Sequence, residues 1–289
     1  MLHKMIKDIR INKGLSQKAV AEGYLSQSNY SKYENGIIDI PVNTFIGILD
    51  NLNISLEEVL FIHNGYKYSQ KEEIYRDFFR LPINSLDTLE QFILRCNTYL
   101  ETKYDPFISY IHEISTILKE AIIHHDIYYA KNIATNLLKQ FNKKNTLYEK
   151  DLYLINSIFF LFPIETANYT MEYIESVVEK YGEFNSIYRI FVNLQMNYSL
   201  MLIKEKKYAK AINTLEKTLP LTKKYRMIAQ MAVLYIRLGI CQGNLAIQSE
   251  TDFIQKGLTI LDVIEEHALL EIMNLEVEKY SASSKQVDV

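Results

Sequence analysis

The scarcity of residues that break helices limits the fold of this chain more than any other feature. Only nine Gly and five Pro occur in 289 residues, while 48% of the residues are apolar. Turn-rich β folds need Gly and Pro far more often than this, whereas long helices exclude them from their interiors. The sequence therefore predicts an all-α protein, long enough to form either one large domain or two unequal ones.

The sequence lacks both a membrane span and a signal peptide, which indicates where in the cell the protein is found. No apolar run approaches the ~18 residues that a membrane span needs, and the start, residues 1–4, lacks the apolar core of a signal peptide. We therefore expect a cytoplasmic protein with no membrane partner. Cys96 and Cys241 lie far apart in apolar helical stretches, which favours small buried thiols over a disulfide or metal ligands.

Helix start and stop signals divide the first sixty-odd residues into five short helices. An apolar pattern over residues 3–12 predicts the first helix, and Ser16, Ser26 and Ser55 are good N-caps for the second, third and fifth. Pro41 starts the fourth. Five short helices in so few residues predict a compact domain, which we assign to residues 1–63.

The helical pattern changes after a stretch without period, residues 64–70, which is the candidate linker. Residues 71–289 show helices of roughly 15 to 20 residues with short connections, which is typical of antiparallel neighbours. The predicted breaks lie near Pro82, Asp105-Pro106, Asn142 to Asn145, Pro163, Tyr181-Gly182, Lys206-Lys207 and Ser249.

A weak internal repeat indicates that these helices stack as a tetratricopeptide-like α-solenoid. The segment 208–211 fits the second helix of such a unit, and Gly239 fits the first helix of the next. In this register Asn156, Asn197 and Arg237 are equivalent, 41 and 40 residues apart. The period exceeds the usual 34 residues or so, which indicates degenerate repeats.

The third helix has the pattern of a helix that enters the major groove of DNA. Tyr30 and Tyr33 share one face, which leaves polar side chains on the others, and Gln17 begins the preceding helix, where it can donate to a phosphate. The alternative is a polar surface helix of an ordinary bundle. The polar residues that suit base contacts are Gln27, Ser28, Asn29 and Lys32.

Net charge does not decide between these readings. The chain carries −3 overall, and residues 1–65 hold six Lys or Arg against seven Asp or Glu. Five of those six basic residues fall within the first eighteen positions, opposed there only by Asp8. A local positive face on the first domain therefore remains open.

The first sixty residues resemble the Cro/repressor type of helix-turn-helix almost position by position. This resemblance implies an ion pair between Arg10 and Glu34, base or groove contacts from the third helix, and phosphate contacts from Gln17 and Asn35. The residues that carry it are Ile9-Arg10, Lys13-Gly14-Leu15-Ser16-Gln17, Ala21, Ser26-Gln27-Ser28 and Tyr33-Glu34-Asn35-Gly36.

The turn of residues 23–26 is one residue shorter than in phage repressors and is similar to that of quorum-sensing regulators of the Rgg and PlcR type. Those regulators share the layout of a helix-turn-helix, a linker and a helical repeat domain. The resemblance implies that a short re-imported signalling peptide binds the concave groove of the repeats and controls a homodimer. A two-fold dimer would read a palindromic operator in double-stranded DNA.

Several residues of the repeat region suit such a peptide. Asn193 and Asn197 share a helix face and can each donate to and accept from a peptide backbone. Arg237 could bind a carboxylate with two hydrogen bonds. Asn156 and Tyr153 would continue the groove upstream. The alternative is that these residues are solvated or bonded between helices, and we interpret Lys204 at a helix end as solvated.

The sequence contains no recognisable catalytic motif. There is no phosphate-binding glycine loop, no nucleophile elbow and no zinc-protease motif, so we expect neither an enzyme nor a cofactor. The run His124-His125-Asp126 projects its side chains in different directions from a helix, so no metal site is expected. A second hypothesis keeps peptide binding but makes the chain a protein-interaction adaptor with a non-functional DNA-binding domain.

Overall fold

The computed structural model describes residues 2–81, 85–124, 127–142, 146–182, 184–248 and 252–281, and every regular element in these ranges is a helix. The breaks expected near Pro82, at 143–145 and at Ser249, and the residues His125 and Asp126, lie outside them. The chain divides into two compact units, Met1–Arg80, called the head below, and Leu81–Val289, called the repeat unit. The predicted linker at 64–70 stays a prediction.

The head contains the five predicted short helices and a sixth. The side-chain oxygens of Ser16, Ser26 and Ser55 accept backbone N–H groups three residues on, so all three predicted N-caps are confirmed. The helices are α1 Leu2–Asn12, α2 Gln17–Ala21, α3 Gln27–Glu34, α4 Val42–Leu52, α5 Leu56–His63 and α6 Gln70–Phe78.

A buried ion pair joins α1 to the end of α3. Arg10 Nε and Nη2 donate to the two carboxylate oxygens of Glu34 at 2.6 and 2.9 Å, and Arg10 Nη1 donates to the Leu15 carbonyl at 2.9 Å. Gln17 Nε2 donates to the same carboxylate at 2.8 Å. The ion pair implied by the resemblance is therefore confirmed.

The ionisation of Glu34 stabilises the head. Burial alone would raise the pKa of Glu34, but the hydrogen bonds from Arg10 and Gln17 outweigh it and hold this pKa below its usual value. A lowered carboxyl pKa stabilises the folded state fully above the pKa of an unfolded glutamate. That stabilisation is lost as the pH falls through the lower pKa of folded Glu34.

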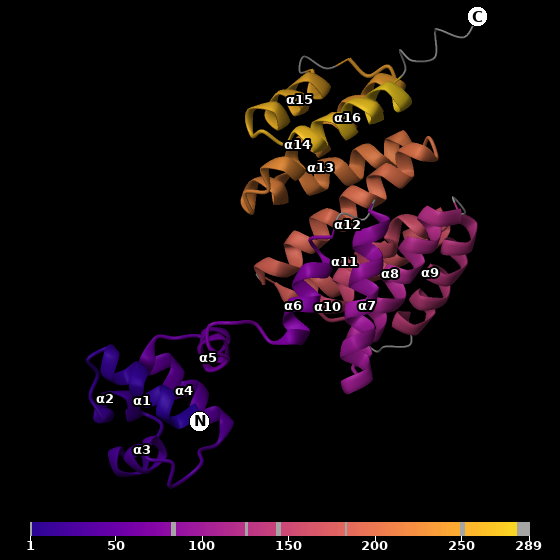
Figure 1. Ribbon diagram of the computed structural model, residues 1–289. Coiled ribbons are helices and arrows are strands. Elements are labelled where there is room, and N and C mark those ends of the chain that lie inside the picture. The colour runs from indigo at the N-terminus through magenta and orange to yellow at the C-terminus, as the bar shows by residue number, and fades with distance from the viewer. Residues whose placement is uncertain are drawn as a thin grey trace, which may run out of the picture. The chain divides into compact units, whose positions relative to one another are not determined.

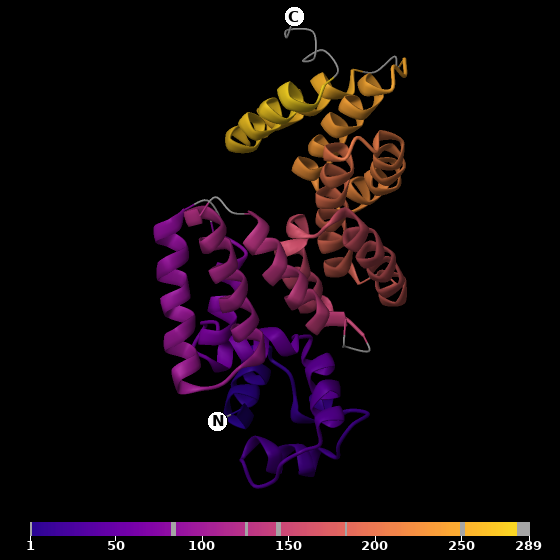
Figure 2. The ribbon, with the colours of Figure 1, turned by 90° about the vertical axis from the view of Figure 1, so that its right-hand side faces the viewer.

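The repeat unit is a succession of antiparallel helices (Figures 1 and 2). The helices α10, α12, α14 and α16 contact one another in sequence, and we call them the continuous row. The helices α13 and α15 each pack against two members of that row. The bounds are α7 Leu86–Thr102, α8 Pro106–His124, α9 Ile127–Asn142, α10 Glu149–Ile158, the short 3-10 helix η1 Phe159–Leu161, α11 Ile164–Tyr181, α12 Asn185–Lys204, α13 Tyr208–Lys224, α14 Ile228–Asn244, α15 Phe253–Val263 and α16 His267–Tyr280.

The helices α14 and α15 cross closely at two glycines. A Cβ added at Gly239 would lie 2.6 Å from a side-chain carbon of Ile254 and 2.9 Å from its backbone nitrogen. A Cβ at Gly257 would lie 2.5 Å from the backbone oxygen of Ala232. Backbone atoms cannot yield as a flexible side chain can, so glycine is required at this crossing.

No helix in the described ranges is both long enough and apolar enough to cross a membrane.

We expect Arg10→Met to destabilise the head by about 3–5 kcal/mol, because it leaves the Glu34 carboxylate buried without its cation. Hydrogen exchange of the α3 amides in the full chain measures this loss. The exposed Lys18→Met is the control for removing a cation. If the α3 amides of the Arg10 variant exchange as slowly as those of the wild type, the pair does not hold α3 in place.

Two glycines of α14 provide a matched pair of substitutions with opposite expected signs. Gly239→Ala should destabilise the repeat unit by about 1–3 kcal/mol, since the new methyl group meets the α15 backbone. Gly243→Ala should stabilise it by up to about 1 kcal/mol, because nothing lies within 4 Å of the added Cβ and alanine is the better helix former. Denaturant unfolding of both variants tests this, and equal effects would contradict the close crossing.

Candidate DNA-binding and ligand-binding sites

The helix α3 exposes one polar face and buries the other. Tyr30 and Tyr33 lie in the core of the head, 0% and 5% exposed, beside Val20 and Ile48. Because these rings hold the helix against the head, the opposite face is presented to solvent on a fixed support. The exposed residues are the predicted set Gln27, Ser28, Asn29, Lys32 and Asn35.

Gln17 differs from the other predicted DNA contacts because it is half-buried and already bonded. One of its amide N–H groups is used by Glu34. An amide carries two N–H donors, so one donor is left for a phosphate. Glu34 thus fixes the orientation of the Gln17 side chain, and the predicted phosphate contact stays a prediction.

Predicted peptide-binding residues from two helices of the continuous row meet in the repeat unit. Asn197 Nδ2 on α12 donates to Asn156 Oδ1 on α10 at 3.0 Å. This bond uses one donor and one acceptor, and it leaves the Asn197 oxygen and the Asn156 N–H groups for a ligand. Asn193 lies one turn earlier on α12 and Tyr153 one turn earlier on α10, both half-buried. Burial, and then the charge of Glu149, raise the pKa of the Tyr153 hydroxyl, so it stays a neutral donor.

The side chain of Arg237 is buried and bonded inside the repeat unit, so it does not present its guanidinium to solvent. It is 7% exposed, and its Nε and Nη2 donate to the two carboxylate oxygens of Glu276 on α16 at 2.6 and 2.9 Å. Its Nη1 donates to the Met196 carbonyl on α12 at 2.6 Å. The guanidinium therefore already holds a carboxylate bidentately, one that belongs to the chain itself. Binding a ligand carboxylate there, which stays a prediction, would require displacing Glu276.

Lys204, interpreted from the sequence as a solvated helix end, is the last residue of α12 and is exposed, so that interpretation is confirmed. It lies on α12 seven residues after Asn197, on the same helix face. Partial burial first, and then the positive charges of Lys279 and Arg237, lower the pKa of Lys204 even though Glu276 opposes them. Lys204 therefore lies among charges of both signs, on the helix face that also carries Asn193 and Asn197.

Residues 6–59 match the helix-turn-helix family. These residues are a helix-turn-helix domain. The match begins at the core residue Ile6 of α1 and ends at Val59 of α5, so it spans α2, α3 and α4 and parts of α1 and α5.

Solved structures share the arrangement of this helix-turn-helix domain followed by helical repeats. A protein of Listeria monocytogenes EGD-e described as a transcriptional regulator is 18% identical, with 96% of each chain covered and a TM-score of 0.77. PlcR of Bacillus thuringiensis, solved with the peptide PapR7 and DNA, is 20% identical, with 94% of this chain and 98% of that one covered and a TM-score of 0.64. The pheromone receptor Rgg2 of Streptococcus dysgalactiae is 16% identical, with 96% and 99% covered and a TM-score of 0.73. The predicted fold of the Rgg and PlcR type is confirmed.

The cysteines are buried and unpaired with each other, as predicted. Burial raises the pKa of both thiols, Cys96 and Cys241, to about 12, so neither is a ready thiolate. Within the part of the chain that the structure describes, no three His, Cys, Asp or Glu side chains gather closely enough to hold a metal ion.

Proposed function

We propose that this chain is a homodimeric, sequence-specific DNA-binding transcription regulator controlled by a short peptide bound on the continuous row. The observation that carries the proposal is that this one chain has two separate polar faces, one on α3 and one on α10 and α12. The exposed face of α3 belongs to a helix-turn-helix domain, and the bonded asparagines of α10 and α12 belong to the repeats. PlcR, with which the chain shares its fold, has been solved with both a peptide and DNA.

In the DNA complex, α3 enters the major groove with its N-terminal turn toward the base edges. Gln27, Ser28 and Lys32 then contact bases or the groove wall, with Asn29 beside them. Gln17 at the start of α2 and Asn35 at the C-terminal end of α3 contact phosphates and fix the register of α3. A single short helix reads few bases, which is why two heads on a palindrome are needed for specific binding.

In the peptide complex, the asparagine side chains pair the backbone of an extended ligand. Asn156 and Asn197 offer a donor and an acceptor side by side, and Asn193 extends the set by one turn. Since Arg237 is engaged by Glu276, the ligand's C-terminal carboxylate would meet Lys204 and Lys279 instead. Tyr153 covers the opposite end of the ligand with a ring and a hydroxyl.

The last helix supplies a candidate surface for the homodimer. Ile272 and Leu275 of α16 are 57% and 64% exposed, and Val263 at the end of α15 is 74% exposed. Apolar side chains on consecutive turns of a terminal helix favour burial against a second copy of the same surface.

We expect Gln27→Ala to weaken binding by about 1–3 kcal/mol at one operator position and to leave folding unchanged. The operator is first selected from a random pool of double-stranded DNA with the full chain. Gln248→Ala, the same change at an exposed residue of the repeat unit, is the control. A wild-type chain whose binding to random DNA is weak and does not fall as salt rises would favour the adaptor hypothesis.

We expect Asn197→Ala to abolish the response to the peptide while DNA binding without peptide is retained. Native mass spectrometry of the chain purified from its own host identifies the bound peptide, which is then synthesised and titrated. Asn274→Ala, the same change on an exposed position of α16, is the control. An Asn197 variant that responds as the wild type does would show that the ligand lies elsewhere.

A further inference from the structure

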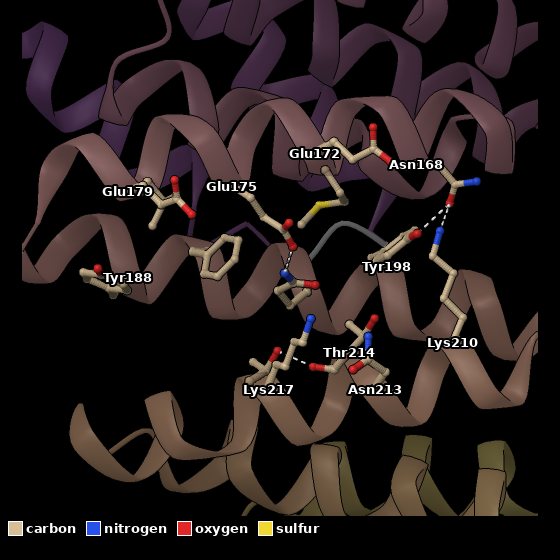
Figure 3. A pocket seen from close by; sticks show the side chains of 15 residues that line it. Asn168, Glu172, Glu175, Glu179, Tyr188, Tyr198, Lys210, Asn213, Thr214 and Lys217 are labelled. Carbon is tan, nitrogen blue, oxygen red and sulfur yellow. Dashed lines mark hydrogen bonds between the residues drawn. The ribbon is translucent and has the colours of Figure 1, made fainter.

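A cavity lies on the opposite side of α12 from the asparagines of the proposed peptide site. It has a volume of about 410 Å³ and is formed by α11, α12 and α13 (Figure 3). Its floor includes Gln195 of α12, two residues from Asn193 and from Asn197. Two residues correspond to a turn of roughly 200° around a helix, so the cavity and the asparagines lie on opposite faces.

One wall of the cavity carries three carboxylates. Glu172, Glu175 and Glu179 follow one another at spacings of three and four on α11, which places them on one helix face. Gln195 Nε2 donates to Glu175 Oε1 at 3.0 Å. Within the described ranges, the side-chain carboxylates of Glu172 and Glu179 have no hydrogen bond or ion pair. Like charges at this spacing destabilise a helix unless a cation approaches.

The opposite wall carries two lysines of α13, one with a bonded ammonium group and one without. Lys210 Nζ donates to Asn168 Oδ1 at 3.1 Å and lies 5.5 Å from the ring centroid of Tyr198. Lys217 lies two turns further along α13 and has no hydrogen bond or ion pair among the described residues. The cavity therefore presents unpaired carboxylates on one side and one unpaired ammonium group on the other (Figure 3).

Apolar side chains line part of the space between the charged walls. Met171 and Val178 are buried, 2% and 3% exposed, and Phe191 and Tyr188 are half-buried and line the same space. An occupant of this cavity therefore meets negative charge, an apolar surface and positive charge in that order.

We propose that this cavity binds a small zwitterion with an apolar body, of the size of an apolar amino acid or a dipeptide. Its ammonium group lies at the row of carboxylates on α11, its carboxylate at Lys217, and its apolar part on Phe191. A simple cation would leave Lys217 unpaired, and a simple anion would be repelled by the α11 wall. The volume lies in the usual range of small-ligand sites, roughly 300–1,000 Å³, and an extended dipeptide spans about 7 Å.

Isothermal titration calorimetry of the full chain with the dipeptide Leu-Phe tests this directly. Two blocked forms separate the charges: N-acetyl-Leu-Phe lacks the ammonium group, and Leu-Phe amide lacks the carboxylate. We expect Leu-Phe to bind at one site per chain and each blocked form to bind about tenfold more weakly or worse, since each loses a charge-assisted hydrogen bond. Failure of both Leu-Phe and phenylalanine to bind at millimolar concentration would overturn the proposal.

Variants locate the bound dipeptide. The double variant Glu172→Gln, Glu179→Gln should weaken Leu-Phe about tenfold, and Lys217→Met should remove the preference for Leu-Phe over its amide. Glu216→Gln, the same change at an exposed α13 residue outside the cavity, is the control. Binding that is lost in Asn197→Ala but kept in the glutamate variants would place the dipeptide at the proposed peptide site and overturn this assignment. Neither result bears on DNA binding or on the peptide response.

Discussion

A buried glutamate that must be paired with an arginine organises each unit of this chain. Removing a guanidinium and a carboxylate from water costs several kcal/mol each, and only close, bidentate geometry offsets that cost. Arg10 and Glu34 meet this demand only when α1 and the end of α3 lie in one relative position. The same pair orients Gln17, so the position of this predicted phosphate contact depends on a carboxylate that does not itself face solvent.

The pair Arg237 and Glu276 has the same geometry in the repeat unit, with distances of 2.6 and 2.9 Å again. It joins α14 to α16, and the third donor of Arg237 adds α12 through the Met196 carbonyl. Three members of the continuous row are thereby held in register by one side chain. The glycine crossing sets the distance between α15 and α14 of the continuous row. The ion pair sets the register of the helices along that row.

Much of this could be predicted from the sequence because the signals are local. The serine caps, the tyrosine face of α3 and the family resemblance each depend on a few adjacent residues. The repeat register placed Asn156 and Asn197 at equivalent positions 41 residues apart, and the structure joins them by a hydrogen bond; the same register extends from Arg237 to Glu276, 39 residues on. That last step was not taken, so Arg237 was assigned to a ligand. The α11–α13 cavity could not be predicted, because surface charges on two separate helices look solvated until the helices are placed on either side of α12.

The arrangement around α16 decides which cation a ligand carboxylate meets. Displacing Glu276 from Arg237 would leave a nearly buried carboxylate without its partner, a cost on the order of 3–5 kcal/mol. A ligand carboxylate at Arg237 would only replace the two bonds that Glu276 already makes, so the exchange is unfavourable unless α16 moves. An anion beside the exposed Lys204 would displace no bonded carboxylate, although burial first, and then the charges of Lys279 and Arg237, lower the pKa of this ammonium group. In the proposed peptide complex, Arg237 therefore acts through the position of α16, while Lys204 is the cation offered to the ligand carboxylate.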